Sequence, residues 1–211
     1  RLSRGLGDVY KRQGVAVLGH HFRNRSYSMS ERLIILKLLG IIDMFPRSAW
    51  ALMVPLSLSL LSVGGYWTLT TEVVLLIWLL GFGWLLLVWQ IHLKPKNPLI
   101  SKLKKIEFVL KLLLAAFYTF LGLTSLFWND PLSEYWLATK SLLFGLIFWS
   151  AIMIDLRFRD LSPAIVKLVE QGSSDETESE TLKIMNRSRF WVRVVYLLLV
   201  MTAFVGTTKF Y

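Results

Sequence analysis

The sequence contains no cysteine, and this absence removes several functions at once. Disulfide bonds, thiolate metal sites and cysteine nucleophiles all require that side chain. The chain also has no HExxH metal motif, no glycine-rich phosphate loop and no dinucleotide fingerprint. These absences argue against a hydrolytic enzyme and do not favour an enzyme of any kind, but they leave redox and transport functions open.

Long apolar runs are the main feature that the sequence does have. Hydrophobic residues fill 55% of the 211 positions, and they occur in blocks. A membrane-spanning helix needs about 20 mostly apolar residues. Five blocks meet this need and predict spans at 48–67, 72–93, 107–128, 135–155 and 189–208. The sequence therefore predicts an all-α fold, a polytopic transmembrane helix bundle that forms a single membrane domain over 14–211.

Lysine and arginine alternate between the connections of these spans. They are frequent in 23–47, 92–105 and 156–188, and absent from 68–72 and 129–134. Basic connections stay in the cytoplasm. We therefore expect the three basic segments inside and the C-terminus outside, in a bacterial cytoplasmic (inner) membrane.

The net charge of +10 has a sufficient explanation in this arrangement. Basic segments beside a membrane attract anionic lipid headgroups. We therefore expect the lipid bilayer and its headgroups as partners, and no nucleic acid.

The N-terminal residues have a different character from the rest of the chain. Residues 14–19 are apolar but too short to span, and a basic cluster follows them. We interpret 14–25 as the end of a further, truncated transmembrane helix. The preceding 1–13 contain "DVYKRQ", which resembles the translation of a sequencing adapter. Such segments are excluded from fold reasoning.

Two segments near the membrane surface have local helix signals. Ser28 and Glu31 form a capping-box pattern, and the helix that follows, 29–44, is expected to lie along the cytoplasmic interface and to end before Pro46. The connection 156–188 is predicted as a cytoplasmic loop. Within it, 162–172 favours a short helix, and 173–180 is an acidic stretch expected to be a solvated loop, with an acidic metal site as the alternative.

Small residues recur at helix-contact spacing in the third and fourth spans, where they let two backbones approach closely. Ala115, Thr119 and Gly122 lie on the third span, and Ser141 and Gly145 lie on the fourth. Because the connection between these two spans is short, we also expect them to form an antiparallel hairpin.

Lys140 is the most informative charged residue, because it lies about five residues inside a predicted span. A lysine near a helix end can extend toward the headgroups. The alternative is that it faces a polar cavity of a transport protein, with Glu72 and Glu134 as its expected partners on the outer side. Lys111 has a simpler interpretation, an ion pair with Glu107 one helical turn earlier.

Three histidines lie at similar depth near the cytoplasmic ends of predicted spans. They are His20, His21 and His92. Two facing histidines can hold haem or copper, so these residues are the candidate cofactor-binding positions of a redox protein. The alternative is that they are interfacial and bind nothing.

Several segments together resemble a known group of membrane proteins. "HHFRNRSYSMSERL", "IDMFPRSAWALMVPLSLSLL", "LATKSLLFGLIFWSAIMIDLRFR" and "AFVGTTKFY" resemble uncharacterised bacterial inner-membrane proteins akin to the copper-resistance D-type and protoporphyrinogen-oxidase-like membrane families. The resemblance implies a lysine before an apolar run, matched by Lys140, and a histidine in an early span, matched by His20 or His21.

Three hypotheses about function follow. The first is a transport-related protein with a polar site near Lys140. The second is a haem- or metal-binding redox membrane protein that uses His20, His21 or His92. The third is a structural or assembly protein that packs against another membrane protein or forms a homo-oligomer.

Overall fold

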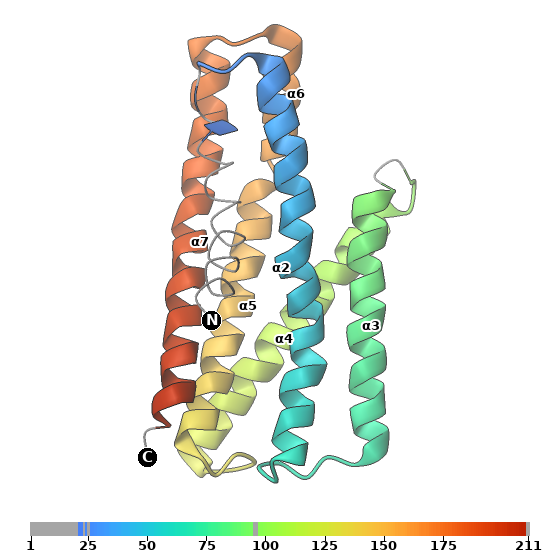
Figure 1. Cartoon of the computed structure of the whole chain (residues 1–211), viewed down its shortest axis with the longest axis vertical. Helices are drawn as coiled ribbons and strands as arrows, with labels where there is room; N and C mark the ends of the chain where they lie inside the picture. Colours follow the sequence, from blue (N-terminus) through green and yellow to red (C-terminus); the bar gives the residue numbers. More distant parts are fainter. Residues whose placement is uncertain (1–20, 23, 25, 95–96, 210–211) are drawn as a thin grey trace, which may run out of the picture.

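The computed structural model describes residues 21–22, 24, 26–94 and 97–209, and within them all regular structure is helical. Its six helices are α2 (Met29–Val63), α3 (Thr71–Leu93), α4 (Ile100–Trp128), α5 (Tyr135–Phe158), α6 (Leu161–Gln171) and α7 (Asp175–Thr208). Figure 1 shows the five long helices side by side, with α2, α6 and α7 projecting beyond the upper ends of α3 and α5. The predicted all-α helix bundle is confirmed.

Four helical segments are long and apolar enough to cross a membrane. They are Thr71–Leu93, Ile100–Trp128, Tyr135–Gln171 and Asp175–Thr208. These segments contain four of the five predicted spans, so the chain is a multi-pass integral membrane protein whose environment is a lipid bilayer. The predicted span 48–67 lies in the second half of α2, which is helical as far as Val63, and its crossing stays a prediction.

The hairpin of α4 and α5 is the most closely packed pair of helices. A Cβ on Gly122 would lie 2.5 Å from the backbone nitrogen of Leu142, and a Cβ on Gly145 would lie 2.5 Å from Thr119 Oγ1. Only glycine leaves room for such an approach, because any larger residue would overlap the facing helix. The predicted use of small residues between these two spans is confirmed.

Helix α2 does not end at Pro46, so the expected separate helix over 29–44 is wrong. It continues for 35 residues with Pro46 and Pro55 inside. Proline removes one backbone hydrogen bond, but side-chain bonds bridge the same turn. Arg47 Nε donates to Asp43 at 2.7 Å, and Ser48 Oγ donates to the Met44 carbonyl at 2.8 Å.

The acidic stretch 173–180 is also different from its prediction, because it is mostly helical. Ser174 caps α7, and Thr177 donates its backbone N–H to the Ser174 hydroxyl at 3.2 Å. Four acidic residues in the first turns suit the positive end of the helix dipole, which explains why this segment is not a loop. The short helix predicted over 162–172 is confirmed as α6.

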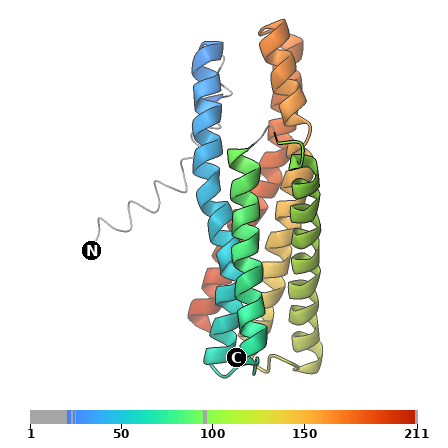
Figure 2. The same cartoon turned by 90° about the vertical axis from the view of Figure 1, so that its right-hand side faces the viewer.

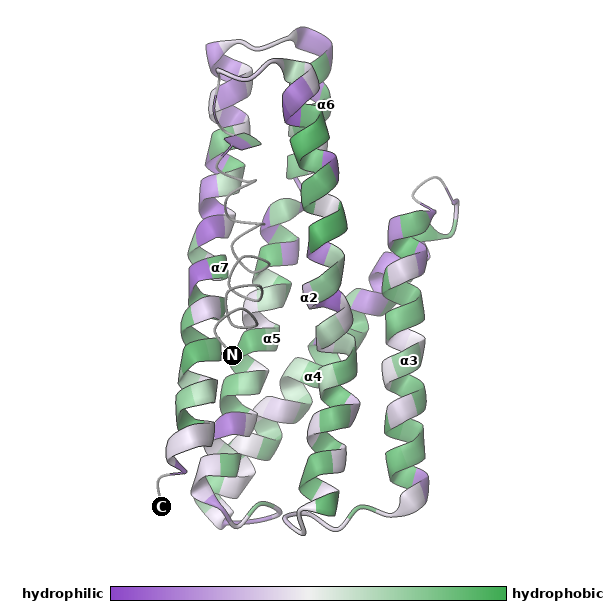
Figure 3. Ribbon diagram, viewed as in Figure 1, coloured by the Kyte–Doolittle hydropathy of each residue, from purple (hydrophilic) through white to green (hydrophobic). Residues whose placement is uncertain are grey.

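The projecting part of the molecule consists of residues 29–45 of α2, together with α6 and residues 175–189 of α7. We refer to it as the helical extension. Figure 2 shows that it is continuous with the bundle below, and Figure 3 shows that its α7 portion is largely hydrophilic while α2 keeps a hydrophobic surface. At its start, Ser28 donates its side-chain and backbone hydrogen bonds to Glu31, and this lowers the pKa of Glu31.

Aromatic rings fill the centre of the bundle. Phe148 is 1% exposed, and the rings of Trp50, Trp84, Tyr118 and Phe144 have their centres 5.1–6.2 Å from it. Ring pairs at these separations attract each other beyond the effect of their burial. The middle of the bundle is therefore closed by side chains, and its charged groups lie nearer the ends.

Candidate functional site

Lys140 lies between α5 and α7, half-buried. Its ammonium is close enough to Gly206 that a Cβ there would lie 2.9 Å from Nζ, and it lies 5.8 Å from the centre of the Trp136 ring. Lys209 approaches the same ring at 5.3 Å. Among the described residues, no ion pair involves Lys140. Its neighbours are thus a glycine and an indole rather than a carboxylate.

The two acidic residues expected as its partners lie elsewhere. Glu72 is exposed in the first turn of α3, and Glu134 is the half-buried residue before α5. No hydrogen bond or ion pair within the described ranges joins either of them to Lys140. The structure does not bring these three residues together as one polar site.

The described histidines have different surroundings. His21 Nδ1 lies 3.0 Å from the Tyr27 hydroxyl, with the two rings edge to face at 5.6 Å. His92 lies beside α2, where a Cβ on Gly40 would be 4.0 Å from its ring. His20 lies outside the described residues. In the part of the chain that the structure describes, no cluster of three or more His, Asp or Glu residues can hold a metal.

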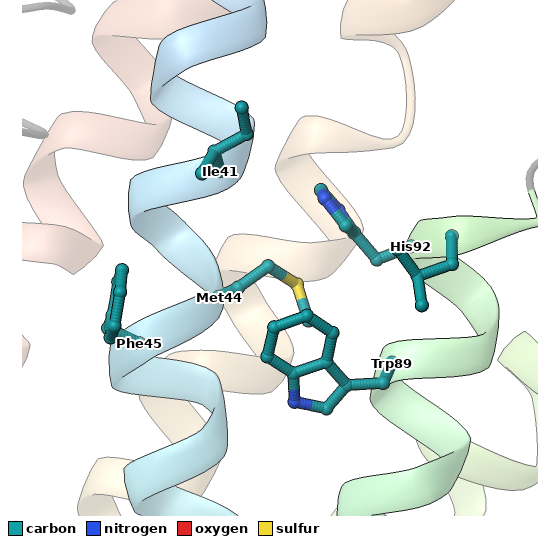
Figure 4. Close-up of a pocket in the computed structure, with 6 residues that line it drawn as sticks. Ile41, Met44, Phe45, Trp89 and His92 are labelled. Carbon is teal, nitrogen blue, oxygen red and sulfur yellow. The ribbon is translucent and has the colours of Figure 1, made fainter.

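His92 belongs to a small apolar pocket of about 240 Å³ between α2 and α3. Figure 4 shows its ring pointing into the space between the helices, near Met44 and Trp89. Trp89 donates from Nε1 to Ser48 Oγ at 3.1 Å and is thereby fixed in place. A pocket with apolar walls and a single histidine can bind a small molecule through one polar contact. The residues that line this pocket include one histidine and not the pair that would hold haem from both sides.

A network of charged side chains joins α4 and α5 near the basic connections, and the sequence predicted only part of it. Lys111 lies 2.7 Å from Glu107, the predicted pair within α4, and its ammonium also donates to Asp155 of α5 at 2.7 Å. Arg47, paired with Asp43, lies within electrostatic range of Asp155 and Glu107. The sequence signal was the spacing of Glu107 and Lys111, while Asp155 at the end of another span gave no such signal.

Burial makes the Lys111 part of this network energetically important. The side chains of Lys111 and Glu107 are 8% and 9% exposed. A buried ion pair contributes little net stability, but removing one partner costs about 3–5 kcal/mol because the other charge stays behind. The network therefore fixes α4 against α5 at their basic ends.

A second buried ion pair, between Arg32 and Glu178, was not predicted from the sequence. Arg32 of α2 donates from both terminal nitrogens to Glu178 of α7, at 2.5 and 3.0 Å, and from Nε to the Phe22 carbonyl at 2.8 Å. Arginine suits this geometry because its planar fork matches a carboxylate. Sequence reasoning could not find the pair, since Glu178 was expected in a loop and lies 146 residues away.

No protein-family model matches the chain, and no curated protein or solved structure is significantly similar to it. The resemblance to the copper-resistance D-type and protoporphyrinogen-oxidase-like families therefore stays a prediction. The class of the protein, a multi-pass integral membrane protein with an all-α fold, rests on its helices alone.

Proposed function

We propose that this membrane protein is a structural or assembly protein that associates with a second copy of itself along α2. One observation carries the proposal, a stripe of exposed apolar side chains that follows one face of this helix. We call it the α2 stripe. Its members are Ile34, Leu38, Ile41, Phe45, Met53, Leu56, Leu60 and Val63.

The length of the α2 stripe is the first argument. From Ile34 to Val63 the helix rises by 29 residues, which is about 44 Å at ~1.5 Å per residue. The hydrocarbon core of a bilayer is only about 30 Å thick. The exposed apolar residues of α3 lie between Val73 and Leu93, and those of α7 between Phe190 and Phe204. Both of these sets fit within the bilayer, and lipid can cover them. The α2 stripe is too long for lipid alone.

The pattern of the α2 stripe is the second argument, and it favours an identical partner. Its apolar residues recur at steps of three and four, apart from one step of eight between Phe45 and Met53. The charged residues of the same stretch, Lys37, Asp43 and Arg47, are not among its members. Such spacing lets two helices pack side by side. Most homo-oligomers have two-fold symmetry, in which one surface contacts its own copy. Two parallel α2 helices would cover each other inside and beyond the bilayer.

The absence of cysteine makes a direct test possible. Single-cysteine variants Leu38→Cys and Leu60→Cys are oxidised in native membranes and analysed for disulfide-linked dimers. Leu79→Cys on α3 is the matched control, because Leu60 and Leu79 are each 68% exposed. We expect dimers from the two α2 variants and not from the control. Equal yields in all three variants, or none from Leu38→Cys, overturn the proposal.

A second candidate function is transport of a proton or small cation, with its centre at the charge network rather than at Lys140. The network has one more carboxylate than cation among Asp43, Arg47, Glu107, Lys111 and Asp155. Ionisable groups inside a membrane bundle often mark an ion pathway. Reconstituted vesicles test this by flux measurement. Lys111→Met should stop flux, while Lys105→Met, at an exposed position, should not.

The orientation in a bacterial cytoplasmic membrane is part of the same proposal. The charge distribution supports the basic connections and the helical extension on the cytoplasmic side, with the end of α7 outside. Reporter fusions test it. A reporter inserted at 172–174 should be active in the cytoplasm, and one at 64–70 should be active outside. The reverse result at either position contradicts the orientation.

A further inference from the structure

A basic pocket lies between α5 and α7, away from the residues discussed above. Arg157, Arg187, Phe190 and Trp191 line an open cavity of about 480 Å³. Arg157 belongs to the last turn of α5, and the other three belong to the middle of α7. We call this cavity the basic pocket. It combines two guanidinium groups with two aromatic rings.

The position of the basic pocket corresponds to the surface of the membrane. In α5 the apolar run ends at Ile154, just before Arg157, and in α7 the polar first half gives way to apolar residues after Arg193. Tryptophan is enriched at this depth because its ring is apolar and its N–H is polar. The pocket therefore lies at the level of the lipid headgroups.

No ion pair among the residues that the structure describes neutralises the charges of the basic pocket. Within the described ranges, Arg157 and Arg187 take part in none of the ion pairs, unlike Arg32, Arg47 and Lys111. Both guanidinium groups line the same open cavity, and an anion placed there would be attracted by both positive charges. A phosphate group suits them well, since it accepts paired hydrogen bonds from the planar fork of arginine.

We propose that the basic pocket binds the phosphate group of an anionic membrane lipid. Arg157 and Arg187 hold the phosphate, and Phe190 and Trp191 contact the glycerol and the first acyl carbons. Basic pockets between helices at the cytoplasmic surface are suited to such headgroups. The proposal does not depend on association through α2, because the two surfaces lie on different helices.

The experiment compares two double variants of equal charge. Arg157→Gln/Arg187→Gln removes the pocket charges. Arg159→Gln/Arg189→Gln removes one arginine directly after α5 and one in α7 that do not line the pocket, and all four arginines are exposed. Each protein is extracted from vesicles of phosphatidylglycerol and phosphatidylcholine, and retained lipid is measured by native mass spectrometry. We expect the first variant to retain at least tenfold less phosphatidylglycerol than wild type, and the second to match wild type.

Two results overturn the proposal. One is equal loss in both double variants, which indicates diffuse attraction to the surface. The other is full retention in the pocket variant. Circular dichroism confirms that each variant is folded, and Trp191→Phe provides a second variant without a charge change, for which a smaller loss of lipid is expected.

A further arm distinguishes a lipid from a soluble anion. Wild-type protein in pure phosphatidylcholine nanodiscs is titrated with inorganic phosphate. No binding at millimolar concentration supports the lipid as source. Saturable binding that depends on Arg157 and Arg187 overturns the lipid assignment, because the pocket then recognises a free phosphate.

Discussion

Arg32 and Glu178 join the beginning of α2 to the beginning of α7. Their side chains are 3% and 1% exposed, and two hydrogen bonds join them although they belong to α2 and α7. Ser173 adds a third donor to the same carboxylate at 2.7 Å. The pair therefore connects the α2 part of the helical extension with its α7 part.

Removal of one partner of this pair should destabilise the extension strongly. We expect Arg32→Met to lower the unfolding free energy by about 3–5 kcal/mol, because the Glu178 carboxylate would stay buried without its cation. The measurement is thermal unfolding in detergent with hydrogen exchange over 175–189. The double variant Arg32→Met/Glu178→Leu should recover part of the loss. A double variant that is as unstable as the single one contradicts this account.

Lys111 provides a similar test inside the bundle. Lys111→Met leaves Glu107 and Asp155 facing each other without a cation, so we expect a loss of about 3–5 kcal/mol. Lys105→Met, on the same helix but exposed, should change stability by less than about 0.5 kcal/mol. Unfolding of the two variants in the same detergent decides the matter, and equal stability would show that the network is unimportant for the fold.

The two glycines Gly122 and Gly83 should respond in opposite ways to alanine. A Cβ at position 122 meets the backbone of Leu142, which cannot move away, so Gly122→Ala should cost about 1–3 kcal/mol. Nothing lies within 4 Å of a Cβ at position 83, so Gly83→Ala should be neutral or slightly stabilising. Melting temperatures of both variants test the packing of α4 on α5. A tolerated Gly122→Ala would contradict the close approach.

Replacement of Lys140 by leucine should have little effect on the stability of the protein. Its ammonium lies 5.8 Å from the centre of the Trp136 ring, and a cation–π contact of an accessible lysine contributes about 0.5–1 kcal/mol. We therefore expect Lys140→Leu to change stability by less than about 1 kcal/mol. A larger loss, measured by thermal unfolding beside Arg193→Leu at an exposed position of α7, would indicate a partner that this arrangement does not provide.

Apolar blocks and small-residue spacing were sufficient to predict most of the fold. The segments of α3, α4, α5 and α7 that are apolar enough to span follow from composition. The short connection 129–134 indicated the hairpin, and Gly122 and Gly145 indicated the close approach of its helices. The errors at Pro46 and at 173–180 have a common cause. In each case a local signal for a break was outweighed by interactions that continue the helix, the bridging bonds around Pro46 and the cap and acidic first turn at Ser174.

The candidate sites were harder to predict, because ion pairs between helices depend on depth as well as on sequence. Glu107 and Lys111 are one turn apart, and their pairing was visible. Asp155 reaches Lys111 only because α4 and α5 are antiparallel with their basic ends level. Arg32 and Glu178 meet only because α2 and α7 both project beyond the upper ends of α3 and α5 (Figure 1). No pattern within either segment contains that information.

The separation of Arg32 and Glu178 along the chain also sets an order of events during synthesis. Arg32 leaves the ribosome 146 residues before Glu178, which corresponds to about 7–30 s at typical rates of translation. During that interval α2 has been synthesised, but Arg32 has no carboxylate to pair with. The α2 and α7 parts of the extension can therefore join only after α3, α4, α5 and α6 have been synthesised, and the apolar second half of α7 leaves the ribosome later still.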